Sequence, residues 1–243
     1  MTTTHSPPSD LPIVFEDVGF TANGVTILDS INLEFAAGAP TVLIGPNGSG
    51  KTTLLRMAMG LLAPSQGQVT WAGRGLDPPS RRGFMFQRPT MLRRSAAGNI
   101  LYALKAASVP RELLDGRVAE LLSIVGLEGL GARPARRMSG GEQQHLALAR
   151  ALACDPAVLF LDEPTASLDP AATKAFEDVV RSVIAHGIKV VMSTHDLGEA
   201  RRLAGEIVML HKGRVIEAST ASAFFNAPQT AESRKFLSGD LLV

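Results

Sequence analysis

The stretch 41–53, TVLIGPNGSGKTT, combines a short apolar run, a glycine-rich loop and the start of a helical pattern. The residues that match the spacing G-x-x-x-x-G-K-[ST] are Gly45, Pro46, Asn47, Gly48, Ser49, Gly50, Lys51 and Thr52. Glycines in such a loop let backbone N–H groups turn toward phosphate oxygens, and the helix N-terminus adds partial positive charge. Lys51 is placed to reach the β- and γ-phosphates, and the Thr52 hydroxyl to bind Mg²⁺. An ordinary glycine-rich turn has no use for Lys-Thr at this offset, so the sequence predicts a nucleotide site.

A second apolar run, AVLFLDE at 157–163, ends in two carboxylates. Ligands gather at the carboxyl ends of parallel strands, so Asp162 and Glu163 are expected beside the phosphate loop. Asp162 is placed to hold Mg²⁺, and Glu163 to polarise an attacking water. The alternative is a strand that simply runs out into solvent, and the phosphate loop argues against it.

Two further apolar runs end in polar residues, FMFQ at 84–87 and KVVMSTH at 189–195. Taken alone, Gln87 is typical of a loop residue and His195 of a hydrogen-bonded structural histidine. The phosphate loop favours a functional role for both, because equivalent strand ends would bring them near the γ-phosphate or the attacking water.

Asp169 followed by Pro170 is a regular helix start, with an Asp cap and Pro at the first position. We expect this helix to end at His186-Gly187. Capping alone would explain Asp169, and we keep that role beside any other.

The segment MSGGEQQ at 138–144 predicts another helix start, because Ser139 and Glu142 have capping-box spacing. Gly140 and Gly141 lie between them, although glycine costs a helix interior about 1 kcal/mol against alanine. Bare backbone at a helix N-terminus lets an anion come close, and this chain alone offers no reason for it.

Short apolar runs alternate with helical patterns over most of the chain, which indicates an α/β fold with a parallel sheet covered on both faces. Residues 90–153 show helical patterns without convincing strands. We interpret them as a helical insertion into an α/β core formed by 11–89 and 154–243. The polar, Pro/Ser-rich residues 1–10 predict a short disordered tail.

Composition narrows the function classes. The net charge of +1 over 243 residues does not point to a large nucleic-acid-binding surface. The one cysteine, Cys154, excludes an intramolecular disulfide and lies in an apolar helix end. No apolar run approaches the ~18–20 residues of a membrane span, so we expect a soluble protein whose membrane role, if any, comes through a partner.

Together the motifs resemble the ATP-binding cassette (ABC) ATPases, and the likeness spans nearly the whole chain. In order they are GPNGSGKTT, FQRP, MSGGEQQ, LFLDEP, SLDP and STHD. The resemblance implies a P-loop NTPase, RecA-like core with an N-terminal antiparallel β subdomain and an inserted helical subdomain. It also implies ATP and Mg²⁺ as cofactors and a head-to-tail homodimer.

The resemblance implies a role for each candidate residue. The SGGEQ segment is the family's signature motif, which caps the nucleotide held by the facing subunit's phosphate loop. Glu163 would be the catalytic base, His195 the switch histidine, and Gln87 part of the loop that links nucleotide state to a membrane partner. The implied metal ligands are Thr52, Asp162 and Gln87. The implied nucleotide contacts are Gly45, Pro46, Asn47, Gly48, Ser49, Gly50, Lys51, Thr52, Thr53, Ser139, Gly140, Gly141, Glu142 and Asp169, the last in a loop that crosses the dimer interface.

Two positions depart from the family pattern. Where an aromatic residue usually stacks on adenine this chain has Ala22, and Phe20 lies two positions before it. The signature begins with Met138 where leucine is commoner, a swap that conserves volume.

One cassette without a fused membrane segment suits the ATPase subunit of a bacterial importer. Such a subunit would lie on the cytoplasmic face of the membrane, on a permease served by a solute-binding protein. The stretch 86–104, FQRPTMLRRSAAGNILYAL, is similar to ATPases of tungstate-type oxyanion importers. Alternatives are an exporter subunit and a soluble ABC ATPase acting on ribosomes or DNA, which commonly has paired cassettes or long coiled coils. A regulator that does not hydrolyse ATP is disfavoured by Glu163 and His195.

Overall fold

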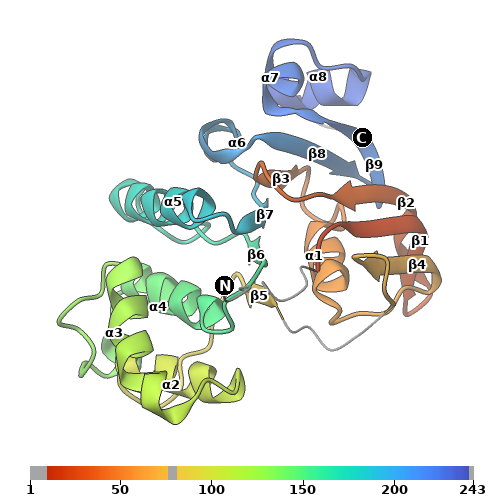
Figure 1. Cartoon of the computed structure of the whole chain (residues 1–243). Coiled ribbons are helices and arrows are strands. Elements are labelled where there is room, and N and C mark those ends of the chain that lie inside the picture. Colours follow the sequence, from red (N-terminus) through yellow and green to blue (C-terminus); the bar gives the residue numbers. More distant parts are fainter. Residues whose placement is uncertain (1–9, 76–80, 241–243) are drawn as a thin grey trace, which may run out of the picture.

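The computed structural model describes residues 10–75 and 81–240. Its centre is a sheet with the strand order β5-β6-β7-β3-β8-β9 (Figure 1). The strands are β3 (Thr41–Ile44), β5 (Arg82–Met85), β6 (Val158–Asp162), β7 (Lys189–Ser193), β8 (Glu206–His211) and β9 (Arg214–Thr220). All neighbours pair in parallel except β8 and β9, which are antiparallel. The predicted parallel sheet is therefore confirmed.

The central strands are apolar throughout because helices or a second sheet cover both of their faces. Every residue of β3, β6 and β7 is buried. On one face, α1 (Lys51–Met59) packs between the parallel sheet and the N-terminal strands, where Leu54, Phe160 and Val191 share one apolar core. On the other face, α5 (Pro170–Ala185) and α6 (Leu197–Leu203) help to enclose a second core, which also contains Leu159 and Met192.

A smaller antiparallel sheet, with the order β2-β1-β4, forms the N-terminal part of the fold. It consists of β1 (Ile13–Ala22), β2 (Val25–Phe35) and β4 (Gln66–Trp71). The antiparallel sheet that the resemblance implied is thus present. The sequence did not predict β4 or β9, since each is an outer strand with few buried side chains. Strand β4 buries only Val69 and Trp71, too few for a periodic signal.

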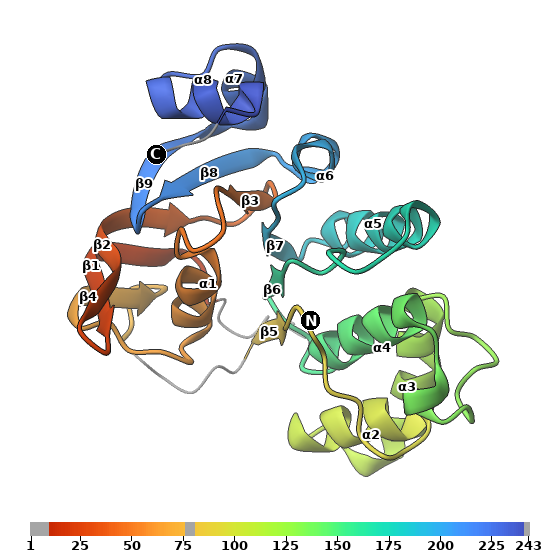
Figure 2. The same ribbon diagram turned by 180° about the vertical axis from the view of Figure 1, so that it is seen from behind.

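The helices of the middle segment lie together at one side of the parallel sheet (Figures 1 and 2). They are α2 (Ala96–Ala106), α3 (Leu114–Ile124) and α4 (Gly140–Leu152), with the short 3₁₀ turns η1 (Arg111–Leu113) and η2 (Ala135–Arg137). The chain ends in two short helices beside β8 and β9, α7 (Ala221–Asn226) and α8 (Ala231–Ser238). In the part of the chain that the structure describes, no helix is both long and apolar enough to span a bilayer.

Residues 1–9 of the predicted disordered tail lie outside the described residues. Asp10, the last residue assigned to that tail, is buried, with 4% of its surface exposed. Its carboxylate pairs with Arg74 at 3.0 Å and with Arg82 at 3.1 Å. The Arg82 guanidinium also lies over the Trp71 ring, 4.6 Å from its centroid. Asp10 thus belongs to the folded part, where it joins the end of β4 to the start of β5.

The buried Phe160 side chain on β6 allows a test of how the core packs. Phe160→Ala removes a side chain with 0% exposure, and we expect the free energy of unfolding to fall by about 3–5 kcal/mol. Urea denaturation followed by circular dichroism measures this. The matched control is Leu61→Ala, because Leu61 is 49% exposed and should change the unfolding free energy by only ~0.5 kcal/mol or less. Equal losses in both variants would contradict the packing described here.

Candidate functional site

The phosphate loop lies between the end of β3 at Ile44 and the start of α1 at Lys51, as the motif requires. Two of its glycines are needed for steric reasons. Gly45 has φ of 139°, and a Cβ added there would lie 2.0 Å from the Leu210 carbonyl oxygen. Gly50 caps α1 with φ of 104°, and its added Cβ would lie 2.7 Å from Leu28 Cδ2. Only glycine lets the loop approach its neighbours this closely.

Lys51 is the cation of this loop, although its side chain is only 6% exposed. Its Nζ donates to the carbonyl oxygens of Gly45 at 2.9 Å and Pro46 at 3.1 Å, and lies 3.9 Å from Glu163 Oε1. Burial lowers the pKa of Lys51, whereas the nearby carboxylates of Glu163 and Asp162 raise it. The loop therefore holds a positive charge at the place where the sequence predicted phosphate.

Oxygen atoms suited to a divalent cation meet beside Lys51. The Thr52 hydroxyl donates to Asp162 Oδ1 at 2.9 Å, and the Ser193 hydroxyl donates to the same oxygen at 2.8 Å. Among residues 10–75 and 81–240, no cluster of three or more His, Cys, Asp or Glu is arranged to hold a metal. Mg²⁺ characteristically takes one or two carboxylates and completes its shell with phosphate and water oxygens. Thr52 and Asp162 fit that pattern.

The Ser49 hydroxyl adds a further group to the phosphate loop. It is buried and has no hydrogen-bond partner in the part of the chain that the structure describes. Buried polar atoms are normally satisfied, so this hydroxyl is suited to a ligand oxygen in the loop.

Glu163 follows β6 directly and has a strained backbone. Its φ of 43° lies in the left-handed region, which few residues other than glycine adopt. Its N–H donates to both the carbonyl and the hydroxyl of Ser193, at 3.1 and 3.0 Å. These two hydrogen bonds to the end of β7 hold the Glu163 backbone in a conformation that is energetically unfavourable without such contacts.

The side chain of Glu163 contacts two of the other candidate residues, Gln87 and His195. Gln87 Nε2 donates to Glu163 Oε2 at 3.1 Å, and His195 Nδ1 lies 3.2 Å from the same oxygen. Glu163 is 15% exposed and His195 55% exposed, so both can be reached from solvent. Both line a cleft of about 540 Å³ together with Ile27, Asn47, Gly48, Ser49, Gly50, Lys51, Thr52, Thr53, Gln87 and Ala166. The structure thus brings together the candidates from four separate strand ends.

The glycine-rich N-terminus of α4 does not lie in the phosphate cleft of its own chain. Ser139, Gly140, Gly141 and Glu142 are not among the residues that line the phosphate cleft. The predicted capping box is present: Glu142 N–H donates to Ser139 Oγ at 3.2 Å, and Ser139 N–H donates to Glu142 Oε2 at 2.7 Å. The second of these bonds lowers the pKa of Glu142. A Cβ added at Gly140 would meet nothing within 4 Å, so packing within this chain does not require glycine there.

Asp169 also lies outside the lining of the phosphate cleft. Its Oδ1 accepts a hydrogen bond from Ala172 N–H at 2.9 Å, so the predicted cap of α5 is confirmed. The helix ends at Ala185 with His186 as its C-cap, as expected.

Ala22 and Phe20, the residues considered at the position where the family stacks an aromatic ring on adenine, both lie in strand β1. Ala22 pairs with Val25 in the β1–β2 hairpin, and Phe20 is half-buried against the core beneath the N-terminal sheet. Ile27, which the sequence did not single out, lines the phosphate cleft instead.

Two polar residues that support the site were also missed. Ser193 joins Asp162 to Glu163, and Gln144 Nε2 donates to the Gln87 carbonyl oxygen at 3.3 Å. Ser193 lies two residues before His195, but only the parallel register of β6 and β7 shows that it faces Asp162.

Comparison with known proteins places this geometry in a family. Residues 28–166 match the family model described as ABC transporter. The chain is 38% identical to a phosphate import ATP-binding protein of Natronomonas pharaonis, over 90% of this chain and 84% of the relative. It is 38% identical to an Fe(3+) ions import ATP-binding protein of Streptomyces avermitilis, over 90% of this chain but only 66% of the relative. A tungstate uptake system ATP-binding protein of Peptoclostridium acidaminophilum is 40% identical, over 80% and 92%.

Solved structures agree with these relatives. The fold matches cbiO1 from Clostridium perfringens, part of an ABC transporter complex, with a TM-score of 0.82 and 26% identity over 88% of this chain and 90% of that one. It also matches the ATP-binding cassette MJ0796, solved as a dimer in a post-hydrolysis state with ADP and Pi. That match has a TM-score of 0.78 and 27% identity, over 86% and 98% of the two chains. The chain belongs to the ABC transporter family and carries its ATPase domain.

Proposed function

We propose that this chain powers an ABC importer by hydrolysing ATP on the cytoplasmic face of the membrane, bound to a separate permease. One observation carries the link between hydrolysis and transport. Gln87 bonds Glu163 at the phosphate cleft, and the residue before it, Phe86, is 45% exposed. The same short segment therefore contacts the reacting site and offers an apolar surface to a partner.

The distances support a division of labour in hydrolysis. Lys51 and backbone N–H groups of the phosphate loop would hold the β- and γ-phosphates, and Thr52 and Asp162 would hold Mg²⁺, which neutralises phosphate charge when bound. Glu163 would accept a proton from the attacking water, and His195, 3.2 Å from Glu163 Oε2, would orient that carboxylate and the γ-phosphate.

We infer that the glycine-rich start of α4 acts on a second copy of the chain. Its residues 139–142 do not line the phosphate cleft of their own chain, and the space beside Gly140 is open. A head-to-tail dimer would seat this helix N-terminus on the γ-phosphate of the facing cleft, where bare backbone N–H groups can come close. Asp169 would lie in the loop that crosses the same interface.

A groove of about 640 Å³ offers a place for the permease. It lies between the end of β5 and the helices α2 and α4, with Phe84, Phe86, Tyr102 and Cys154 among its lining residues. Phe86 and Tyr102 are large apolar side chains that are 45% and 51% exposed. Exposed aromatic side chains around a concave surface are typical of a protein-binding site. A cytoplasmic helix of the permease would fit this groove.

The transported solute is proposed from the relatives. Those named for phosphate import and tungstate uptake concern oxyanions, whereas one is named for Fe(3+) ions. We propose an oxyanion, delivered by a solute-binding protein.

The permease proposal is tested by affinity isolation of the tagged chain from detergent-solubilised membranes. We expect a multi-span membrane protein to co-purify, and Tyr102→Asp to reduce its recovery at least about tenfold by placing a charge in an apolar interface. Leu61→Asp is the control, because Leu61 has similar exposure and does not line the groove. Recovery of ribosomal or DNA-repair components without a membrane protein would overturn the transport function.

Lys51→Ala tests the phosphate loop. Removing the buried ammonium group leaves the phosphate charge without its cation, so we expect the Kd for ATP to rise about tenfold or more. Equilibrium titration with a fluorescent ATP analogue measures this. Lys174→Ala is the control, since that lysine is 76% exposed on α5. An unchanged affinity in Lys51→Ala would contradict the assignment.

Glu163→Gln tests the catalytic base. The amide keeps the shape of the side chain and cannot take a proton, so we expect ATP binding to persist while turnover falls about 10²–10⁴-fold. The variant should also accumulate as an ATP-bound dimer, which size-exclusion chromatography with ATP and Mg²⁺ detects. Full turnover by this variant would remove Glu163 from its proposed role.

A further inference from the structure

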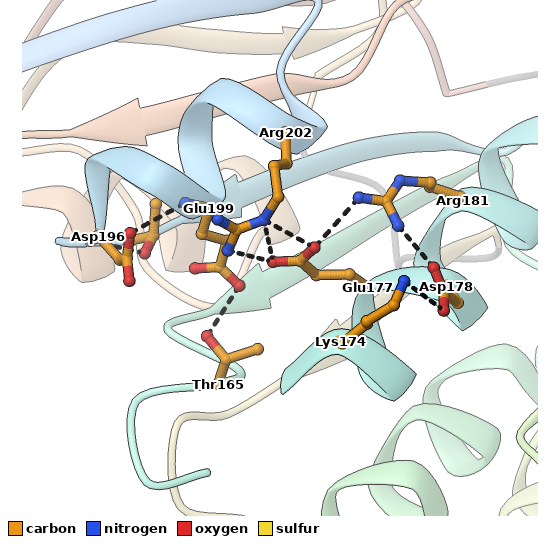
Figure 3. A network of polar contacts seen from close by, with 9 residues as sticks. Thr165, Lys174, Glu177, Asp178, Arg181, Asp196, Glu199 and Arg202 are labelled. Atoms are coloured by element: carbon orange, nitrogen blue, oxygen red, sulfur yellow. Dashed lines mark hydrogen bonds and ion pairs between the residues drawn. The ribbon is translucent and has the colours of Figure 1, made fainter. Parts of the chain in front are cut away.

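The turn that follows Glu163 is tied to helix α6 by one buried hydrogen bond. Thr165, two residues after Glu163, donates from Oγ1 to Glu199 Oε1 at 2.8 Å (Figure 3). Glu199 lies on α6 and is 1% exposed. A buried carboxyl group that bonds a loop hydroxyl fixes that loop more firmly than a solvated one, because water does not compete for the bond.

Glu199 also lies four residues after His195 in the chain. Helix α6 begins at its N-cap Asp196, whose Oδ1 accepts the Glu199 N–H at 2.9 Å, and Asp196 N–H in turn donates to Thr194 Oγ1 at 3.0 Å. His195 stands between Thr194 and Asp196 and reaches Glu163 Oε2 at 3.2 Å. Two hydrogen bonds, Thr165 to Glu199 and His195 to Glu163, thus join the segment after β6 to the segment 195–199, and the Asp196 cap connects Glu199 to the residue next to His195.

A second buried acid anchors α6 itself. Glu177 of α5 is 2% exposed and accepts bonds from Arg202 of α6, at 3.0 Å from Nε and 2.6 Å from Nη2. Arg181 donates to Glu177 Oε2 at 3.1 Å (Figure 3). The Glu177–Arg202 ion pair joins α6 to α5, so it also restrains the position of Glu199 on α6.

The surroundings of Glu199 are acidic as well as polar. Burial raises the pKa of Glu199, as do the nearby charges of Glu177 and Asp196, whereas the hydroxyls of Thr194 and Thr165 lower it. A buried acid is costly to keep unless it is hydrogen-bonded, and Glu199 Oε1 accepts the hydrogen bond that Thr165 donates.

We propose that Glu199 is a positioning residue for ATP hydrolysis, which holds the segment 163–169 through Thr165 and so fixes Glu163 against His195. This inference rests on the proposed function and deepens it. Glu163 has a strained φ of 43°, and strain persists only where neighbouring contacts fix the chain. The backbone N–H of Glu163 is fixed by the bonds that it donates to Ser193, and the Thr165–Glu199 bond fixes the chain two residues further on. Asp169, at the far end of the segment, would be set by the same restraint.

The test measures ATP turnover with Mg²⁺ by the full chain carrying Glu199→Ala, Thr165→Val, both changes, or Glu199→Gln. We expect each of the first two variants to lower kcat about tenfold with KM for ATP within about twofold, since the phosphate loop is untouched. The double variant should be no slower than either single one, because both remove one bond. Glu199→Gln should recover to within about threefold, because its amide oxygen still accepts the Thr165 hydroxyl.

Thermal unfolding of each variant and a control separate positioning from folding. Glu232→Ala removes an exposed carboxylate of α8 and should leave kcat unchanged. If Glu199→Ala does not fold, Thr165→Val and Glu199→Gln carry the test with little change in shape. Values of kcat within about twofold of the parent, effects that multiply in the double variant, or losses only in KM would each overturn the inference.

ATP turnover by the unsubstituted parent chain distinguishes a failure of the positioning role from a failure of the proposed function. If the parent shows no ATP turnover that depends on Glu163, the proposed function fails and the positioning role fails with it. If the parent hydrolyses ATP through Glu163 while the Thr165 and Glu199 variants behave as the parent does, only the positioning role is wrong.

Discussion

The hydroxyl group of Ser193 ties together the two strands on which the site depends. It donates to Asp162 at the end of β6 and accepts the N–H of Glu163, while Ser193 itself ends β7. This is possible because β6 and β7 run in parallel and in register, with Asp162 opposite Ser193. Thr52 reaches the same oxygen of Asp162 from α1. A single buried polar group thus sets where the carboxylates, the phosphate loop and the histidine after Ser193 meet.

The sequence was sufficient for the parts of the molecule with strong local patterns. The buried strands β3, β6 and β7 appeared as continuous apolar runs because both of their faces are covered, and the phosphate loop has a steric pattern that few other structures need. The caps at Ser139 and Asp169 were predictable because each acts within one turn. Strands β4 and β9 were missed because outer strands with few buried side chains carry little periodicity. The boundary at Asp10 was missed because its partners, Arg74 and Arg82, lie more than sixty residues away.

Contacts across the sheet explain what sequence reasoning could not find at the site. Ser193 and Glu199 have no local feature that sets them apart, and their importance arises only when strand register and helix placement bring them to Asp162 and Thr165. The opposite holds for Gly140, whose pattern was visible at once but has no explanation within one chain. Its open surroundings agree with a contact to a separate molecule. Local patterns therefore identified the candidate site residues, and the fold identified the residues that support them.

The capping box at Ser139 has a consequence for the chemistry of that helix end. Ser139 Oγ already accepts the Glu142 N–H, and its own hydrogen is not donated to any residue that the structure describes. Glu142 meanwhile is bonded to the Ser139 backbone and to Arg133 at 3.0 Å, so its negative charge is engaged. The serine rotamer is thus set in advance, and the hydroxyl keeps its O–H donor and one lone pair for a further partner. A ligand rich in lone pairs can therefore take the Ser139 proton in a hydrogen bond without a change of serine rotamer, and the cost of ordering this side chain is met before the ligand arrives.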